Sequence, residues 1–206
     1  MGIIHSSLSA DNLKRLEELA REKLNDPDKI GCQNKLAGQM QNEFLIPEAN
    51  PVIKQQILSM AYEYCNHAPG SQFFNIDFDN ECLELTGGTA WINYQYKHEF
   101  NPLHDHGGLL SFVMWIDIPF TRESEKIASP GRDSIGNCSG AFTFVYSDVF
   151  GKISTCTPEI DFGMDLTGQI FMFPAKLYHM VSPFYSSDQP RISIAGNVDR
   201  FLKSQE

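Results

Sequence analysis

The chain is 206 residues long, with 42% hydrophobic and 20% charged residues, which excludes a disordered or collagen-like protein and allows a sizeable core. Acidic residues outnumber basic ones by 26 to 16, so the net charge is −10 and the chain lacks the cationic surface that nucleic-acid backbones require. The sequence contains no stretch approaching the ~18 apolar residues of a membrane span, so we expect neither nucleic acid nor a membrane as a partner.

The five cysteines indicate a reduced, cytoplasmic protein. They form no Cys-x-x-Cys pair, and their odd number leaves one cysteine over in any disulfide scheme. The N-terminus also lacks the basic flank and apolar run of a secretory signal. Buried structural thiols in a reducing compartment are the simplest account of this pattern, and we therefore expect a cytoplasmic location.

The first 70 residues are predicted to be helical and to support the rest of the domain. One helix is expected from Ser9, a candidate N-cap, to Leu24, because its apolar residues recur on one helical face. A second helix is expected to begin near Pro51 and to end before Pro69. Its inward-facing residues are predicted to be Ile53, Ile57, Met60, Ala61 and Tyr64. The sequence also allows a short helix from Lys35 to Phe44.

After Gly70 the chain changes to short runs of β-forming residues separated by turn residues. The predicted strands are Phe73–Phe78, Glu81–Thr86, Ala90–Tyr96, Leu109–Ile118, Ala141–Tyr146, Gln169–Phe173, Tyr178–Val181 and Arg191–Val198. About eight strands without intervening helices favour a jelly roll or a related double-sheet barrel. We therefore predict one mostly β domain over residues 1–206, with the helical support at 1–70 and the barrel at 71–206. The long polar segment between Phe120 and Gly140 is expected to be a lid or a mobile loop.

Three of the six histidines lie where they could bind a metal. His104 and His106 are two residues apart, and on an extended segment they share a face while Asp105 points away. Two imidazoles on one strand face can hold a single metal ion. His179 is a lone polar residue within the most apolar part of the C-terminal half, a place typical of a core histidine. Combined with the upstream His-x-His pair on a β-barrel, it is a candidate third ligand.

A second polar signal follows His179 by twelve residues. Arg191 and Ser193 alternate with two isoleucines, so they share one face of a predicted strand. This strand could be an edge strand with its polar face in water. Alternatively, Arg191 could lie inside the barrel as a bidentate clamp for a carboxylate, with the Ser193 hydroxyl beside it. The turn at 186–190 would make this strand and the strand of His179 hairpin neighbours, which would bring the clamp close to the metal.

The ordered set His-x-His, Phe-Pro-x4-His and Arg-x-Ser resembles the iron(II)- and 2-oxoglutarate-dependent oxygenases, most closely their small prolyl-hydroxylase-like branch. The stretches that carry the resemblance are Trp91–Tyr94, Phe100–His106, Phe173–His179 and Arg191–Asn197. The likeness covers roughly residues 89 to 200, and the N-terminal helices add nothing specific to it.

The resemblance implies a double-stranded β-helix, a jelly-roll or cupin-like barrel with supporting helices. It implies Fe(II) held by His104 and His179, and 2-oxoglutarate bound by Arg191 and Ser193 with help from Tyr94. The implied enzyme consumes O2, decarboxylates 2-oxoglutarate to succinate and hydroxylates a second substrate, with no catalytic residue beyond the metal centre. That prime substrate would be a protein or peptide, such as a peptidyl proline, or a small molecule.

One position departs from the family pattern. The family's second ligand is a carboxylate, but His106 stands there and the nearest carboxylate is Asp105. A three-histidine face still leaves room for a bidentate 2-oxo acid and O2, although it carries one negative charge less than the usual set. A bulge could turn Asp105 inward instead. Strand alternation needs no special backbone, so His106 is the preferred third ligand.

Two other readings of the sequence compete with the oxygenase. The first is a metal-binding cupin, an isomerase, dioxygenase or sugar-binding barrel that does not use 2-oxoglutarate. Gly168, Pro174 and His179 fit its spacing, but its glutamate after His-x-His is missing and Arg191 has no role in it. The second is a non-catalytic jelly-roll module for binding or for a virion, which leaves the four ordered motifs unexplained.

Overall fold

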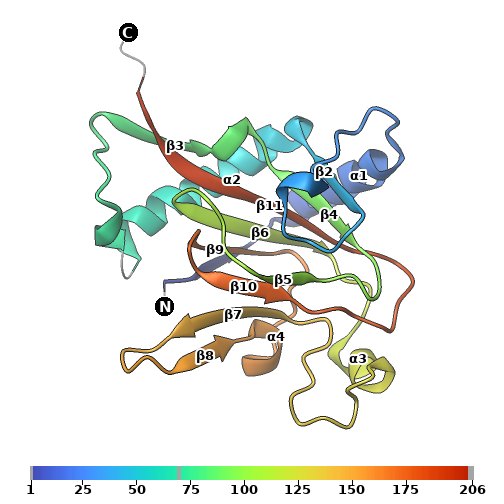
Figure 1. The fold of residues 1–206 in the computed structure, drawn as a ribbon. Coiled ribbons are helices and arrows are strands. Elements are labelled where there is room, and N and C mark those ends of the chain that lie inside the picture. Colours follow the sequence, from blue (N-terminus) through green and yellow to red (C-terminus); the bar gives the residue numbers. More distant parts are fainter. Residues whose placement is uncertain (1, 69–70, 204–206) are drawn as a thin grey trace.

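The computed structural model describes residues 2–68 and 71–203, which form two packed β-sheets with the two long helices on one side (Figure 1). The helices are α1 (Ala10–Asn25), α2 (Asn50–His67), α3 (Arg122–Ala128) and α4 (Pro158–Asp161). The strands are β1 (Ile4–Ser7), β2 (Asn42–Leu45), β3 (Glu81–Leu85), β4 (Trp91–Gln95), β5 (Asn101–His104), β6 (Leu110–Asp117), β7 (Phe142–Ser147), β8 (Ile153–Cys156), β9 (Gln169–Pro174), β10 (Tyr178–Val181) and β11 (Arg191–Leu202). No helix within these described ranges is both long enough and apolar enough to span a bilayer.

The two sheets are the walls of a double-stranded β-helix. Within the described residues, the large sheet has seven strands in the order β1-β9-β6-β11-β4-β2, with β3 also pairing with β11. The small sheet has four strands in the order β5-β10-β7-β8. Every pairing is antiparallel. The predicted mostly β barrel with N-terminal helices is therefore confirmed.

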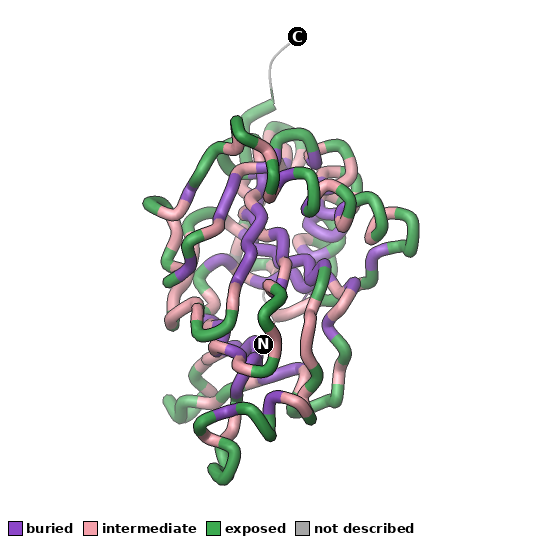
Figure 2. Tube along the Cα trace, turned by 90° about the vertical axis from the view of Figure 1, so that its right-hand side faces the viewer, coloured by how far each residue is buried: buried purple, intermediate pink, exposed green. Residues whose placement is uncertain are grey.

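Apolar residues cover both faces of the large sheet. Helices α1 and α2 pack on its outer face, where Leu16 and Ile53 join a core with Ile92 and Ile194. A second core lies between the sheets and contains Val113, Trp115, Phe142, Phe144, Leu166, Phe171, Phe173 and Val181. Figure 2 shows the buried residues concentrated along the strands and the exposed ones along the outer loops. Because its central strands are covered on both sides, seven of the eight residues of β6 are buried.

The two long predicted helices are confirmed. The Ser9 hydroxyl caps α1 by accepting a hydrogen bond from the Asn12 backbone N–H at 3.2 Å. Helix α2 begins one residue before Pro51 and ends before the predicted Pro-Gly stop. All five of its predicted inward-facing residues are buried, namely Ile53, Ile57, Met60, Ala61 and Tyr64.

The N-terminal 70 residues are not purely helical, because β1 and β2 belong to the large sheet. β1 pairs with β9 and β2 pairs with β4, so both gain their strand conformation from partners far away in the chain. The short helix allowed over 35–44 is wrong. Only Gln33–Lys35 forms a 3-10 turn there, and the chain then extends into β2.

Most predicted strands after residue 80 are confirmed to within a few residues, but three expectations differ from the structure. The segment Phe73–Phe78 forms no strand, and a 3-10 turn occupies Ser71–Phe74. β5 and β8 were not predicted. The strands of His179 and Arg191 are not hairpin neighbours, because the connection between them crosses from the small sheet to the large one.

The segment between Phe120 and Gly140 contains α3 and is fastened to the barrel. Glu125 is buried, and its carboxylate accepts hydrogen bonds from the backbone N–H groups of Tyr185 and Ser186 at 2.8 to 3.1 Å. The Arg122 guanidinium donates to the carbonyls of Asn137 and Ser139. A lid movement of this segment stays a prediction.

Candidate metal centre

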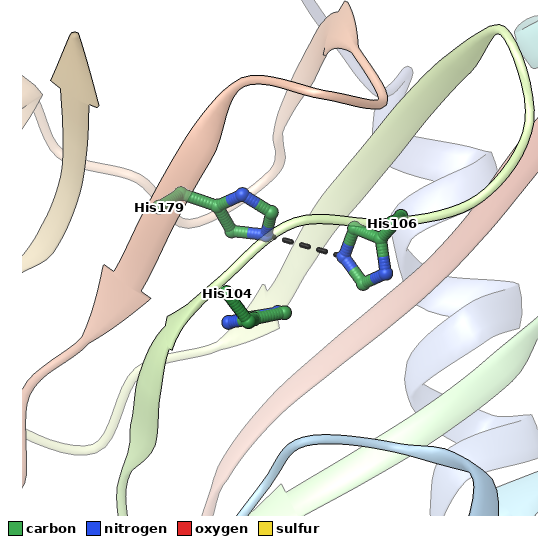
Figure 3. Close-up of side chains that lie close together, drawn as sticks. All are labelled: His104, His106 and His179. Atoms are coloured by element: carbon green, nitrogen blue, oxygen red, sulfur yellow. Dashed lines mark hydrogen bonds between the residues drawn. The ribbon is translucent and has the colours of Figure 1, made fainter.

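Three imidazoles converge between β5 and β10 (Figure 3). His104 is the last residue of β5 and lies directly opposite His179 of β10 in the antiparallel register. His106 follows two residues after His104, and its backbone N–H donates to the Ala175 carbonyl at 2.8 Å. One ring nitrogen from each histidine lies within 4.8 Å of the others, and the Nε2 atoms of His106 and His179 are 3.2 Å apart. The structure thus brings together the three histidines selected from the sequence.

Backbone carbonyls orient two of the rings. The Nδ1 atom of His104 lies 2.7 Å from the Pro102 carbonyl oxygen, and Nδ1 of His179 lies 2.9 Å from that of Leu177. A carbonyl oxygen only accepts, so each Nδ1 carries the hydrogen and donates it. The lone pairs of the two Nε2 atoms are then directed into the space shared with His106, the arrangement usual for metal-ligating histidines.

Burial keeps these imidazoles neutral. Desolvation, with the neighbouring histidines adding to it, lowers the pKa of His179 to about 3 and that of His106 to about 4. Desolvation also lowers the pKa of His104. All three are therefore uncharged at neutral pH, the protonation state in which histidine binds metals. Three neutral nitrogen donors around one point fit a divalent transition metal.

Asp105 is not part of this group. Its side chain points away from the three rings, and its Oδ2 lies 3.3 Å from Nζ of Lys176. The alternation expected for an extended segment accounts for this orientation, because residues 104 and 106 share one side and residue 105 takes the other.

A cavity of about 50 Å³ adjoins the histidines and is lined by residues of both sheets. Ser193 of β11 lines it, and its hydroxyl accepts a hydrogen bond from Asn93 Nδ2 at 3.2 Å. Trp115 also lines the cavity, and the Arg191 guanidinium lies 5.3 Å from the centre of its ring. Arg191 and Ser193 therefore share the inner face of β11, as alternation predicts.

The Arg191 side chain is completely enclosed. Its Nη2 and Nε donate to the single Oε1 atom of Gln95 at 2.5 and 3.2 Å. Nη1 donates to the Gly140 carbonyl, and Nη2 also donates to the Ser182 carbonyl. Desolvation lowers the pKa of Arg191 to about 10, so the guanidinium is still charged at neutral pH. Of the two alternatives for this strand, the edge strand with its polar face in water is wrong, because Arg191 and Ser193 are buried in the barrel interior.

Tyr94 does not reach the cavity, whereas the role that the family resemblance implies for it, helping to bind 2-oxoglutarate, requires it to face the barrel interior. Its ring belongs to the core beneath the helices, and its hydroxyl donates to the Ala20 carbonyl of α1 at 2.5 Å. The inner face of β4 instead carries Trp91 and Asn93, both of which line the cavity. The strand itself is as predicted, but its inward face is the one that carries Trp91 and Asn93, not the one that carries Tyr94.

Sequence reasoning missed several polar residues of this cavity. Asn93, Asn101 and Trp115 each have a buried side-chain N or O atom without a hydrogen-bond partner, and so does Glu43 of β2. Asn93 directly precedes Tyr94, so strand alternation places the two side chains on opposite faces of β4. Asn93 would therefore have been the candidate if the other face had been taken as the inner one. Glu43 gave no signal, because the strand that carries it was not predicted.

The family model described as "Putative 2OG-Fe(II) oxygenase" matches residues 89–197, slightly more than half of the chain. This range includes the three histidines, Arg191 and Ser193. No curated protein sequence matches the chain.

Several solved structures share its fold at low sequence identity. A Pseudomonas putida prolyl-4-hydroxylase has a TM-score of 0.57 at 12% identity, and the match covers 98% of this chain and 93% of that one. The non-heme alpha ketoglutarate dependent epimerase SnoN from nogalamycin biosynthesis has a TM-score of 0.55 at 15% identity, covering 97% and 77%. HygX from Streptomyces hygroscopicus, solved with nickel and 2-oxoglutarate bound, has a TM-score of 0.51 at 12% identity, covering 96% and 82%.

Proposed function

Because the chain belongs to the family of 2OG-Fe(II) oxygenases, which use Fe(II), 2-oxoglutarate and O2, we propose that it is a hydroxylase whose iron is held by His104, His106 and His179. The observation that carries this assignment is the convergence of three neutral imidazoles on one point, two of them oriented by backbone carbonyls. Bound iron and 2-oxoglutarate supply the oxidising power, with succinate and CO2 as the products of the cosubstrate.

The walls around the histidines support a dry reaction site. The ring of His179 lies 4.9 Å from that of Phe173 and 6.0 Å from that of Phe142, and Trp91 lies 6.0 Å from His106. Apolar rings on these sides exclude water from a reactive centre and keep the ligands in fixed orientations.

Arg191 and Ser193 are proposed to bind the far carboxylate of 2-oxoglutarate. Two guanidinium donors of Arg191 now share one neutral amide oxygen of Gln95. A carboxylate offers two oxygens and a full negative charge to the same donors, so it would compete favourably for them. The Ser193 hydroxyl hydrogen is available to donate beside it, because Ser193 is the acceptor in its bond with Asn93.

The test of this function measures iron content and succinate release under defined conditions. Protein purified under argon and loaded with Fe(II) should bind 2-oxoglutarate by calorimetry and release succinate when O2 is admitted. A cupin would bind the metal without 2-oxoglutarate, and a non-catalytic jelly roll would bind neither. Analysis of the product then separates hydroxylation from other outcomes, such as the epimerisation for which SnoN is named.

The variant Arg191→Lys tests whether Arg191 binds the carboxylate of 2-oxoglutarate. Lysine cannot reproduce the planar fork, so the affinity for 2-oxoglutarate should fall about tenfold or more while the iron content stays the same. Arg21→Lys makes the same exchange on the exposed surface of α1 and should change neither quantity. Equal affinities for 2-oxoglutarate in Arg191→Lys and the parent would refute the clamp.

A further inference from the structure

A buried carboxyl group without a cationic partner lines the same cavity as the three histidines. Glu43 is only 1% exposed, and its Oε2 atom has no hydrogen-bond partner. No lysine, arginine or histidine among the described residues forms an ion pair with it. A carboxyl group in such a place lowers the stability of the fold, which suggests that it is retained for function.

The strand register explains how Glu43 reaches the cavity. Glu43 of β2 lies opposite Asn93 of β4, Asn93 lies opposite Ser193 of β11, and Ser193 lies opposite Trp115 of β6. Four side chains from four adjacent strands thus form a row across the inner face of the large sheet, and all four line the cavity. Glu43 stands at the end of this row that is farthest from Trp115.

The row is chemically polarised. The end of the row at β6 and β11 carries hydrogen-bond donors, namely the Trp115 Nε1–H, which has no partner, and the Ser193 hydroxyl. The Arg191 guanidinium lies on the same face of β11. At the β2 end lie acceptors without partners, Oε2 of Glu43 and Oδ1 of Asn93. Donors suit the anionic cosubstrate, whereas acceptors suit a group that carries N–H bonds and positive charge.

At its β2 end the cavity reaches a segment that borders the molecular surface. Leu36 and Ala37 line the cavity there, and Ala37 is exposed. A Cβ atom on the neighbouring Gly38 would come within 2.8 Å of Glu43 Oε1, so the glycine leaves room for the carboxyl group. A substrate entering past this segment would meet Glu43 before it reached the histidines.

We propose that Glu43 binds a protonated amine of the prime substrate, which is therefore a cationic compound or a basic side chain of a peptide. This inference rests on the proposed oxygenase function and names the substrate class of that same site. The net charge of −10 favours the approach of cations to the molecule. An amine ion-paired with Glu43 would also leave Asn93 Oδ1 as an acceptor for a second N–H of the same group.

The test compares side-chain amines with counterparts in which that amine is acetylated, on the metal-loaded protein. Protein carrying Fe(II) and 2-oxoglutarate under argon is titrated calorimetrically with lysine, Nε-acetyl-lysine and short peptides containing either residue. Each amine should bind at least about tenfold more tightly than its acetylated partner, as expected for a desolvated charge pair. The free amino acids and the peptides distinguish a small-molecule substrate from a protein side chain.

Glu43→Gln keeps the size of the side chain and removes the carboxyl group that would pair with the amine. The variant should lose the preference for amines while its iron content and its affinity for 2-oxoglutarate stay within twofold of the parent. Glu63→Gln makes the same exchange on the exposed surface of α2 and should keep the preference. Thermal melting confirms that both variants are folded.

The proposal is overturned if no amine binds more tightly than its acetylated partner, or if Glu43→Gln retains the preference. A failure of the underlying function gives a different result, since the parent protein would then not bind 2-oxoglutarate in the presence of iron.

Discussion

Replacing Glu43 with glutamine should stabilise the metal-free protein at neutral and mildly alkaline pH. Desolvation, with the charge of Glu99 as a second cause, raises the pKa of Glu43 from 4.5 to about 7. Between these values the unfolded chain has released this proton while the folded chain still holds it. The folded state binds more protons, so its stability falls as the pH rises through this interval.

The size of the effect follows from the two pKa values. A difference of roughly 2.5 pH units, at about 1.36 kcal/mol each, sets an upper limit of about 3 kcal/mol on the stability lost between pH 4.5 and 7. Glutamine does not titrate and should be free of this loss. Relative to the parent, Glu43→Gln should therefore gain up to about 3 kcal/mol in unfolding free energy between pH 4.5 and pH 8.

Urea unfolding of both proteins at several pH values measures this gain. The buried histidines titrate in both proteins, so their contributions cancel in the difference. Glu63→Gln, on the exposed face of α2, should show no such gain. If Glu43→Gln and the parent gave parallel profiles, Glu43 would ionise near its ordinary value and water would have to reach the cavity in solution.

Two further predictions concern the site and its surroundings. His106→Ala should lose most of its iron after a chelator wash under argon. Asp105→Ala should retain its iron, because Asp105 pairs with Lys176 outside the cavity. The reverse result would mean that a bulge brings the carboxylate inward. Tyr94→Phe should cost about 1 kcal/mol of stability through the lost bond to Ala20, while calorimetry should find its 2-oxoglutarate affinity unchanged. A weaker affinity of Tyr94→Phe for 2-oxoglutarate would show that Tyr94 does help to bind the cosubstrate.

Strand alternation predicted that His104 and His106 lie together because it depends only on local geometry. His104 and His106 are two residues apart near the end of β5, so any extended conformation places them together and Asp105 apart. The same rule placed Arg191 and Ser193 on one face of β11. These relations hold whatever the rest of the fold does.

The face that a strand turns inward is not a local property, and this is where the sequence was misleading. Alternation groups Ile92 with Tyr94 and Trp91 with Asn93, but both faces of β4 are covered, one by helices and the other by the small sheet. Both groups contain residues suited to burial, so hydrophobicity does not distinguish them. The register with β11, fixed by distant residues, decides the question.

Glu43 escaped prediction for a related reason. The four residues of β2 have no marked strand pattern, and they form a strand because they pair with β4 along the edge of the large sheet. Strand formation of this kind depends on the partner far more than on local propensity. When such a strand brings a polar residue into a site, the sequence around that residue does not predict its position there.

The strands of His179 and Arg191 do not form the predicted hairpin, and this affects how the site can bind its ligands. The metal candidates lie on or next to the small sheet, whereas Arg191, Ser193 and Glu43 all lie on the large sheet. A hairpin would have put the clamp and the metal side by side on one wall. In the observed fold they face each other across the barrel interior, so a cosubstrate that touches both must bridge the two sheets. The substrate amine bound by Glu43 would then be held by the same wall as the clamp, leaving the small sheet to carry the metal alone.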